Sequence, residues 1–246
     1  MCLRQPSGSS RSDKKGTKCY TLFIMNADHS SAKNMRHVLE KLRGVDAINE
    51  VRIKDKLIEY VAVESKLLGR LAIRRLDVED SAALFDFYFQ GLSRESRNYF
   101  PPYPLFSPPL NSMEELSSRI TEWKKEDDWA FLNLAKDELI IGVCLLKRYQ
   151  PKRPVSGLAV REQYQKMGLG VLLQTIVNEQ ARLSNLKKLY ATIAPDNAAS
   201  LRTHRTCGFK ETGIVVPHVG YRNGIKEVDR LDIEMVIELN YRKTNS

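Results

Sequence analysis

The chain has 246 residues, of which 42% are hydrophobic and 28% are charged, and its formal net charge is +9. This composition is typical of a globular protein with room for one full domain and a smaller one, and the lack of an apolar run of about 18 residues excludes a membrane-spanning helix. Four scattered cysteines without a C-x-x-C pair argue against a zinc site or a disulfide framework and, with no signal-peptide core at the N-terminus, predict a cytoplasmic protein.

Residues 1–17 are rich in Ser, Gly, Arg and Lys and predict an unstructured basic tail. Through Lys18 the tail has five basic residues and one acidic residue, so it supplies +4 of the net charge and leaves +5 for the other 228 residues. A basic tail suits contact with nucleic-acid phosphates, but this tail has no interleaved aromatic residues for base stacking. We therefore do not expect nucleic acid to be the main partner. Nucleic-acid association through the tail ranks third, after the two functions considered below.

Residues 18–65 predict a small β-α-β-β module. Ser30 or Ser31 is placed to cap its helix, and Gly44 is placed to end it. Short runs rich in β-branched and aromatic residues, bounded by polar turns, predict the strands. The three predicted strands are Tyr20–Ile24, Ile48–Ile53 and Leu57–Val63, the last two joined by a turn at residues 54–56.

This module resembles the small ferredoxin-like domains that carry heavy metals. Those domains place two cysteines at the turn before the first helix, where this chain has Ala27 and Ser30. Because thiolates are the ligands that soft metals select, we expect no metal here. A structural, a regulatory and a dimer-forming role are all compatible with the module, so a homodimer is one assembly to consider.

A second unit begins at Gly69. Leu71–Leu76 is predicted to be a strand, and Ala82–Leu92 an apolar helix. Residues 93–112 hold five of the ten prolines and predict an irregular loop, which either lines an acceptor site or packs as a rigid surface loop.

Alternating strands and helices follow this loop. Ser112 and Glu115 form a capping box that opens a helix ending near Trp123. Asn223-Gly224 predicts a tight hairpin turn near the end of the chain. The predicted strands are Trp129–Leu134, Leu139–Leu146, a run from Val155, Lys187–Ala194, Ile214–Tyr221 and Val228–Leu239, and further helices begin at Leu169 and Asn197.

The stretch from Val155 to Leu173 has the strongest functional signal. A strand runs into Gln165–Gly170, a turn with two glycines, and then into a helix. The first amides of a helix have no acceptor within it, and the helix dipole favours an anion beside them. Gly168 and Gly170 let the backbone approach a ligand. The helix is inferred from apolar residues at i, i+3, i+4 and i+7, which are Leu169, Leu172, Leu173 and Ile176.

Two motifs resemble the GCN5-related N-acetyltransferases (GNAT). The Q-x-x-G-x-G run at Gln165–Gly170 is similar to the family's acetyl-CoA pyrophosphate loop, and Asn197, Ser200 and Gly208-Phe209 are similar to its N-x-x-S…G-F segment. From Leu71 the predicted order β-α-α-β-β-β-α-β-α-β-β matches the GNAT arrangement. The resemblance implies an α/β fold, a GNAT domain at residues 69–241 with a mixed, centrally splayed β-sheet flanked by helices, preceded by the small β-α-β-β module.

The resemblance also implies an acetyl-CoA-dependent N-acetyltransferase, in which an amine attacks the thioester within a ternary complex. Backbone groups of Leu158, Ala159 and Val160 would pair with the pantetheine arm as a neighbouring strand would. Asn197 would bond the cofactor or only cap the helix that follows. The other implied cofactor-binding residues are Ser200 and the loop residues Gln165, Lys166, Met167, Gly168, Leu169 and Gly170.

His204 stands where many GNAT members carry a tyrosine that protonates the departing thiolate. A histidine serves as this acid if its pKa stays near 7 or above; otherwise it donates a hydrogen bond to the sulfur or only fills space. The general base is not assigned. Glu162 lies toward the glycine loop, and Glu138 lies in a predicted hairpin turn.

The sequence does not distinguish between two kinds of acceptor, a primary amine of a protein and a primary amine of a small molecule. Residues 89–96 resemble a segment of some bacterial protein-lysine acetyltransferases, and six acidic residues gather about the helix that Ser112 opens. Such a cluster attracts a cationic amine or is only a solvated face. A non-catalytic acyl-CoA-binding sensor is the alternative function.

Overall fold

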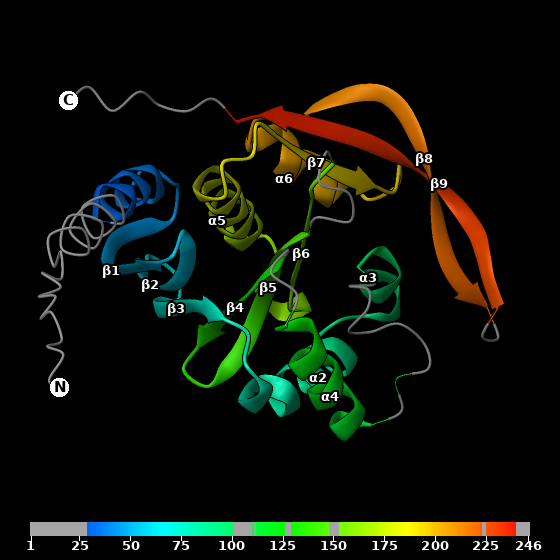
Figure 1. The fold of residues 1–246 in the computed structure, drawn as a ribbon, viewed down its shortest axis with the longest axis horizontal. Coiled ribbons are helices and arrows are strands. Elements are labelled where there is room, and N and C mark those ends of the chain that lie inside the picture. The colour runs from blue at the N-terminus through cyan, green and yellow to red at the C-terminus, as the bar shows by residue number, and fades with distance from the viewer. Residues whose placement is uncertain are drawn as a thin grey trace, which may run out of the picture.

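The computed structural model describes residues 29–100, 110, 112–125, 129–147, 153–222 and 225–239. Within these residues, nine strands form one mixed sheet in the order β1-β2-β3-β4-β5-β6-β7-β9-β8 (Figure 1). Neighbouring strands are antiparallel except β6 and β7, which are parallel. The strands are β1 (Val45–Lys54), β2 (Leu57–Ser65), β3 (Gly69–Arg75), β4 (Trp129–Lys136), β5 (Leu139–Lys147), β6 (Val155–Val160), β7 (Lys188–Ile193), β8 (Lys210–Arg222) and β9 (Ile225–Glu238).

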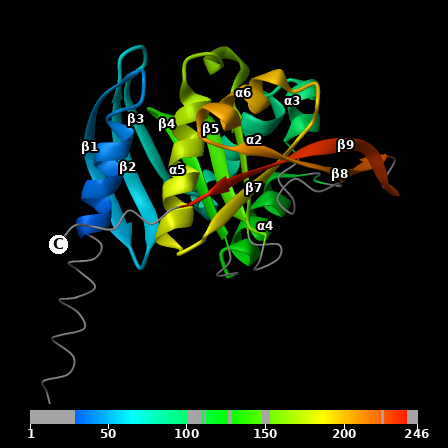
Figure 2. The same cartoon turned by 90° about the horizontal axis from the view of Figure 1, so that it is seen from above.

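Helices cover both faces of this sheet. Successive residues of a strand point to opposite faces, and on β5 Val143 joins one hydrophobic cluster while Cys144 joins the other. The first cluster lies under α2 (Ser81–Phe89) and α4 (Met113–Trp123). The second lies under α5 (Leu169–Leu183) and includes residues of α6 (Ala198–Thr206) and of the N-terminal helix, which covers residues 29–39 and lies beside α5 (Figures 1 and 2). The expected mixed sheet flanked by helices is confirmed.

The N-terminal strands extend the sheet of the second unit. β1 and β2 form the predicted hairpin, and its turn residues Asp55 and Lys56 both have positive φ. β2 then pairs with β3 over six residues, from Tyr60↔Arg74 to Ser65↔Gly69. The proposed division of the chain after residue 65 therefore runs between two paired strands. The predicted strand at residues 20–24 and the basic tail lie outside the described residues.

The predicted irregular loop at residues 93–112 needs a correction, because it begins with a short helix, α3 (Arg94–Tyr99). Ser93 starts this helix, since its side chain accepts a hydrogen bond from the N–H of Ser96 (3.1 Å). The prolines begin two residues after α3 ends. The cap predicted for the next helix is confirmed, because the N–H of Glu115 donates to the Ser112 hydroxyl (3.2 Å) at the start of α4.

Candidate functional site

β6 and β7 separate as soon as they meet. Val155↔Tyr190 is the single register pair between them in the described part of the chain, and the N–H of Tyr190 donates to the carbonyl of Pro154 (2.9 Å). The other edge of β6 pairs with β5 along its whole length. The backbone of Leu158–Val160 therefore has a strand partner on the β5 side and no pairing with β7. This is the splayed arrangement predicted for these three residues.

The glycine turn lies between the end of β6 and the start of α5. Gln165 has an extended backbone, and its side-chain amide donates to the carbonyl of Val160 (3.3 Å). Lys166 and Gly168 both have left-handed backbones, with φ of 62° and 83°. Gly168 is the N-cap of the 15-residue α5. The amides that open α5 therefore belong to the predicted loop and have no acceptor within the helix.

The second glycine of the motif packs against α6. A Cβ at Gly170 would lie 3.3 Å from the Thr203 hydroxyl oxygen, which is tighter than ordinary contact. Gly170 therefore lets α5 and α6 approach each other. A substitution there changes helix packing together with the loop, so Gly168 is the cleaner position for testing the loop.

Asn197 and Ser200 lie at the start of α6. The Asn197 side-chain oxygen accepts a hydrogen bond from the N–H of Ser200 (3.0 Å), so Asn197 caps the helix. This cap uses the amide oxygen and leaves the side-chain NH₂ as a donor. The Ser200 hydroxyl lies 3.4 Å from Nδ1 of His204. The structure thus joins three of the predicted residues into one short network.

His204 is buried, with 3% of its surface exposed. Its Nδ1 lies 2.9 Å from the Ser200 carbonyl oxygen, which can only accept, so Nδ1 carries the proton. Nε2 is buried and has no hydrogen-bond partner among the described residues, and the ring meets Phe209 edge to face at 5.0 Å. Burial lowers the pKa of His204, although the bond to Ser200 opposes this shift. This environment favours a neutral imidazole and works against an acid that must hold its proton near pH 7.

The lowered pKa of His204 predicts how stability depends on pH. Below pH 6.5 the histidine of the unfolded chain binds a proton, whereas the buried His204 of the folded protein stays neutral. The free energy of unfolding therefore decreases as the pH drops from 6.5 toward the lower pKa of the folded protein. The loss is at most about 1.4 kcal/mol per pH unit. Urea unfolding from pH 8 to 5 should show a smaller loss for His204→Gln than for the wild type. Parallel curves would mean that burial does not shift this group.

Two buried carboxylates on β9 were not singled out from the sequence. Asp232 and Glu234 are each 3% exposed, and both point to the face that carries Tyr190. Asp232 accepts from Arg230 Nε (2.7 Å), while Glu234 pairs with Arg153, whose guanidinium lies over the Tyr190 ring. In the sequence, these two carboxylates are two residues apart and alternate with apolar residues. That pattern is more typical of a strand whose polar face is exposed to solvent.

The two carboxylates considered as a base have different surroundings. Glu162 accepts hydrogen bonds from the N–H of Ser93 (3.1 Å) and the hydroxyl of Ser96 (2.5 Å). Partial burial alone would raise the pKa of Glu162, but these bonds lower it overall. Glu162 therefore fastens the end of β6 to the start of α3. Glu138 is exposed in the β4–β5 turn.

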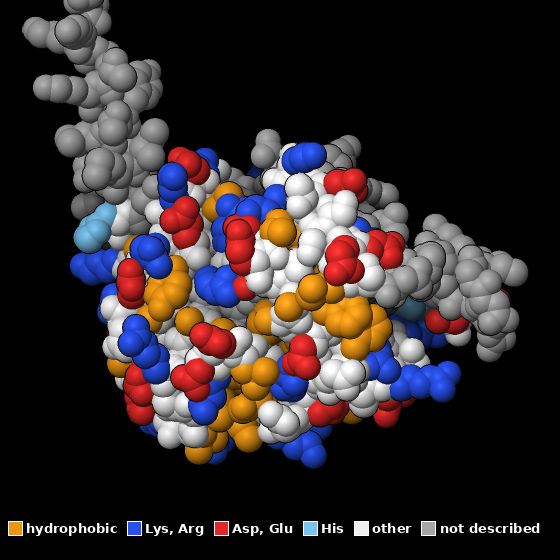
Figure 3. Space-filling view, turned by 90° about the horizontal axis from the view of Figure 1, so that it is seen from below, with side chains coloured by type: hydrophobic (Ala, Val, Ile, Leu, Met, Phe, Trp, Pro, Cys, Tyr) orange, Lys and Arg blue, Asp and Glu red, His pale blue; other side chains and the backbone are white. Residues whose placement is uncertain are grey.

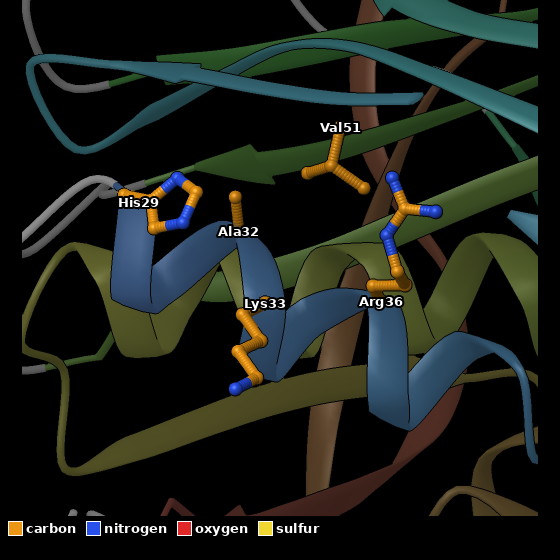
Figure 4. Close-up of a pocket in the computed structure, with 5 residues that line it drawn as sticks. All are labelled: His29, Ala32, Lys33, Arg36 and Val51. Atoms are coloured by element: carbon orange, nitrogen blue, oxygen red, sulfur yellow. The ribbon is translucent and has the colours of Figure 1, made fainter. Parts of the chain in front are cut away.

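A small pocket of about 240 Å³ lies against the N-terminal helix (Figure 4). His29, Ala32, Lys33, Arg36 and Val51 line it. The Arg36 guanidinium donates to the carbonyls of Ile48 and Asn49. These bonds fasten the helix to β1, so we interpret the pocket as a packing feature of the N-terminal unit.

The described residues have mixed charges on the face in Figure 3 and no cluster of metal ligands. On the face in Figure 3, Lys and Arg side chains are interspersed with Asp and Glu. Among the described residues, no three His, Cys, Asp or Glu side chains gather as a metal ion would require. A search of the same residues for a helix that is long and apolar enough to cross a bilayer finds none.

Comparisons with known proteins agree with this geometry. Residues 70–210 match a family model described as an acetyltransferase (GNAT) domain. Comparison with curated protein sequences finds no match. Solved structures share the fold at low sequence identity.

A ribosomal-protein-S5-alanine acetyltransferase from Vibrio fischeri is 17% identical, with 69% of this chain and 93% of that one covered and a TM-score of 0.56. RimL, a ribosomal L7/L12 alpha-N-protein acetyltransferase in complex with coenzyme A, is 18% identical over 69% and 94% of the two chains, with a TM-score of 0.56. The putative acetyltransferase yncA from Salmonella typhimurium, solved with its cofactor acetyl-CoA, is 20% identical over 72% and 98%, with a TM-score of 0.53. At these identities the likeness concerns the fold.

Proposed function

Because this chain belongs to the acetyltransferase (GNAT) family, we propose that it is an N-acetyltransferase that moves the acetyl group of acetyl-CoA to a primary amine. One observation supports this most: β6 and β7 part after Val155 and Tyr190, directly beside the glycine-bearing start of α5. A parted strand edge suits an amide-containing arm, and a helix N-terminus suits its phosphates. Both parts of CoA thus have a matching surface.

In this proposal the backbone of Leu158, Ala159 and Val160 pairs with the pantetheine arm. The amides of Gln165–Gly170 hold the pyrophosphate, with Lys166 adding charge beside it. The proposal puts Asn197 and Ser200 at the mouth of the opening, where the side-chain NH₂ of Asn197 would donate to the cofactor. In this proposal the main contribution of the protein to the rate is positioning the two substrates against each other.

The reaction is a direct transfer in a ternary complex. The neutral amine attacks the thioester carbonyl, the new C–N bond forms, and the C–S bond breaks. The amine loses a proton and the departing thiolate gains one. His204 is the candidate acid that protonates the thiolate, although its burial opposes that role.

A non-catalytic acyl-CoA sensor is the second candidate. The buried, neutral His204 favours it, because a site that holds CoA without supplying a proton would bind the cofactor and turn it over slowly. The acceptor in the first candidate is a protein or small-molecule amine. Since two of the neighbours are named as acetyltransferases of ribosomal proteins, protein amines belong in any test.

Free-thiol release from acetyl-CoA tests the proposed function. We expect release above the rate of hydrolysis with at least one amine in a panel of polyamines, amino acids and peptides with free N-termini or lysines. The His204→Gln variant should keep its CoA affinity and lose turnover by about 10²-fold if His204 is the acid. CoA binding without thiol release for any amine would favour the sensor. No CoA binding at all would refute both candidates.

A further inference from the structure

The N-terminal unit touches the glycine loop. The residues that follow the N-terminal helix, 40–44, lead into β1, and they precede the matched family domain at residues 70–210. A Cβ at Gly168 would lie 3.6 Å from the carbonyl oxygen of Arg43. The backbone of this segment is therefore in van der Waals reach of the N-cap of α5, where the cofactor phosphates are proposed to bind.

Two cations of this segment are free to act on a ligand. Lys41 and Arg43 are exposed, and within the described residues neither side chain has an ion-pair partner. Glu40 lies in the same segment, while the next carboxylate, Asp46, pairs with Lys66 (3.7 Å). The backbone of Arg43 lies beside Gly168, and its long, flexible side chain is suited to bind a phosphate held at the start of α5.

The N-terminal unit to which this segment belongs is fastened to α5. Near the C-terminal end, the side chain of Gln180 accepts from the N–H of Ile58 (2.9 Å) and donates to the carbonyl of Lys56 (3.0 Å). The buried residues Met35 and Leu39 of the N-terminal helix belong to the same hydrophobic cluster as residues of α5. The segment therefore keeps a fixed position relative to the loop, and its cations are preorganised.

We propose that residues 40–44 form a wall of the cofactor site and that Arg43, assisted by Lys41, binds a phosphate of CoA. This inference rests on the proposed function and assigns the N-terminal unit a role in it. Phosphates are recognised well by guanidinium groups, which add charge and directed hydrogen bonds. The pyrophosphate and the 3′-phosphate share this chemistry, and the experiment distinguishes them.

The test compares two double variants of the full chain by calorimetry with CoA. Lys41→Ala with Arg43→Ala should weaken CoA binding about tenfold, the effect of losing one charge-assisted hydrogen bond. Lys54→Ala with Lys56→Ala is the control: it also removes two exposed cations of the N-terminal unit, but at the turn that Gln180 binds, about 17 Å along α5 from its start. The control should retain wild-type affinity, and both variants should keep the wild-type melting temperature.

Dephospho-CoA identifies the phosphate. If Arg43 binds the 3′-phosphate, the tenfold difference between wild type and variant disappears with dephospho-CoA; if it binds the pyrophosphate, the difference persists. The slope of affinity against salt should also become shallower in the variant. Equal affinities of the variant, the control and the wild type would overturn this inference and leave the proposed function standing. A wild-type protein that does not bind CoA would overturn both.

Discussion

A Gly168→Val variant is expected to lose at least about 100-fold in CoA affinity, which corresponds to about 2.7 kcal/mol. Gly168 has a φ of 83°, a left-handed conformation that costs a β-branched residue energy that glycine does not lose. The turn must then shift, and the amides that open α5 change direction. The carbonyl oxygen of Arg43 lies 3.6 Å from the point that a Cβ at residue 168 would occupy, which is ordinary contact, so the expected loss comes from the backbone conformation.

Gly213→Val supplies the matched control for this test. Gly213 has nearly the same backbone, with a φ of 80°, and nothing lies within 4 Å of a Cβ placed there. It sits at the irregular start of the β8–β9 pairing, away from the α5 loop. The control should lose stability through the same backbone strain and still bind CoA. Equal affinity losses in both variants would show that strain alone explains the result, and the loop would lose its assignment.

Much of the fold was predictable because its signals are local. Ser112 placed the start of α4, apolar spacing placed α5, and the two-glycine turn located the candidate cofactor loop between β6 and α5. Each signal lies within about one or two turns of chain, where hydrogen bonding and side-chain spacing leave a direct mark on the sequence. The short helix α3 was missed because proline-rich sequence follows it closely.

The candidate site was harder to predict, since its remaining features depend on contacts distant in sequence. No local pattern shows that β2 pairs with β3 in a shared sheet, or that Arg43 lies against Gly168. Burial of His204 depends on packing with Phe209 and on neighbouring elements, so the pKa that its role requires was not readable from its position in a motif. Asp232 and Glu234 likewise occupy strand positions that usually face water.

The attachment of the N-terminal unit predicts a second large effect. Gln180→Leu should lower stability by about 3 kcal/mol, because the leucine fills a similar volume but leaves the N–H of Ile58 and the carbonyl of Lys56 without their buried partner. For a chain of this size, that loss lowers the melting temperature by about 6–12 °C. Hydrogen exchange at the Ile58 amide should accelerate, since this amide donates directly to Gln180.

Gln174→Leu, on the same helix, is the control. It separates the effect of the two Gln180 hydrogen bonds to Ile58 and Lys56 from the general effect of removing a buried amide. Gln174 is fully buried, but its side-chain oxygen has no hydrogen-bond partner within the described residues, and its NH₂ bonds only Asn178 (3.0 Å). The substitution removes one unsatisfied oxygen but leaves the side-chain oxygen of Asn178 without its donor, and because these effects oppose each other, stability should change by less than about 1 kcal/mol. Equal losses of stability in the two variants would contradict the proposed attachment of the N-terminal strands to α5 through Gln180. A loss confined to Gln180→Leu would show that this side chain fastens the N-terminal strands to α5, the helix whose first turn is proposed to bind the cofactor.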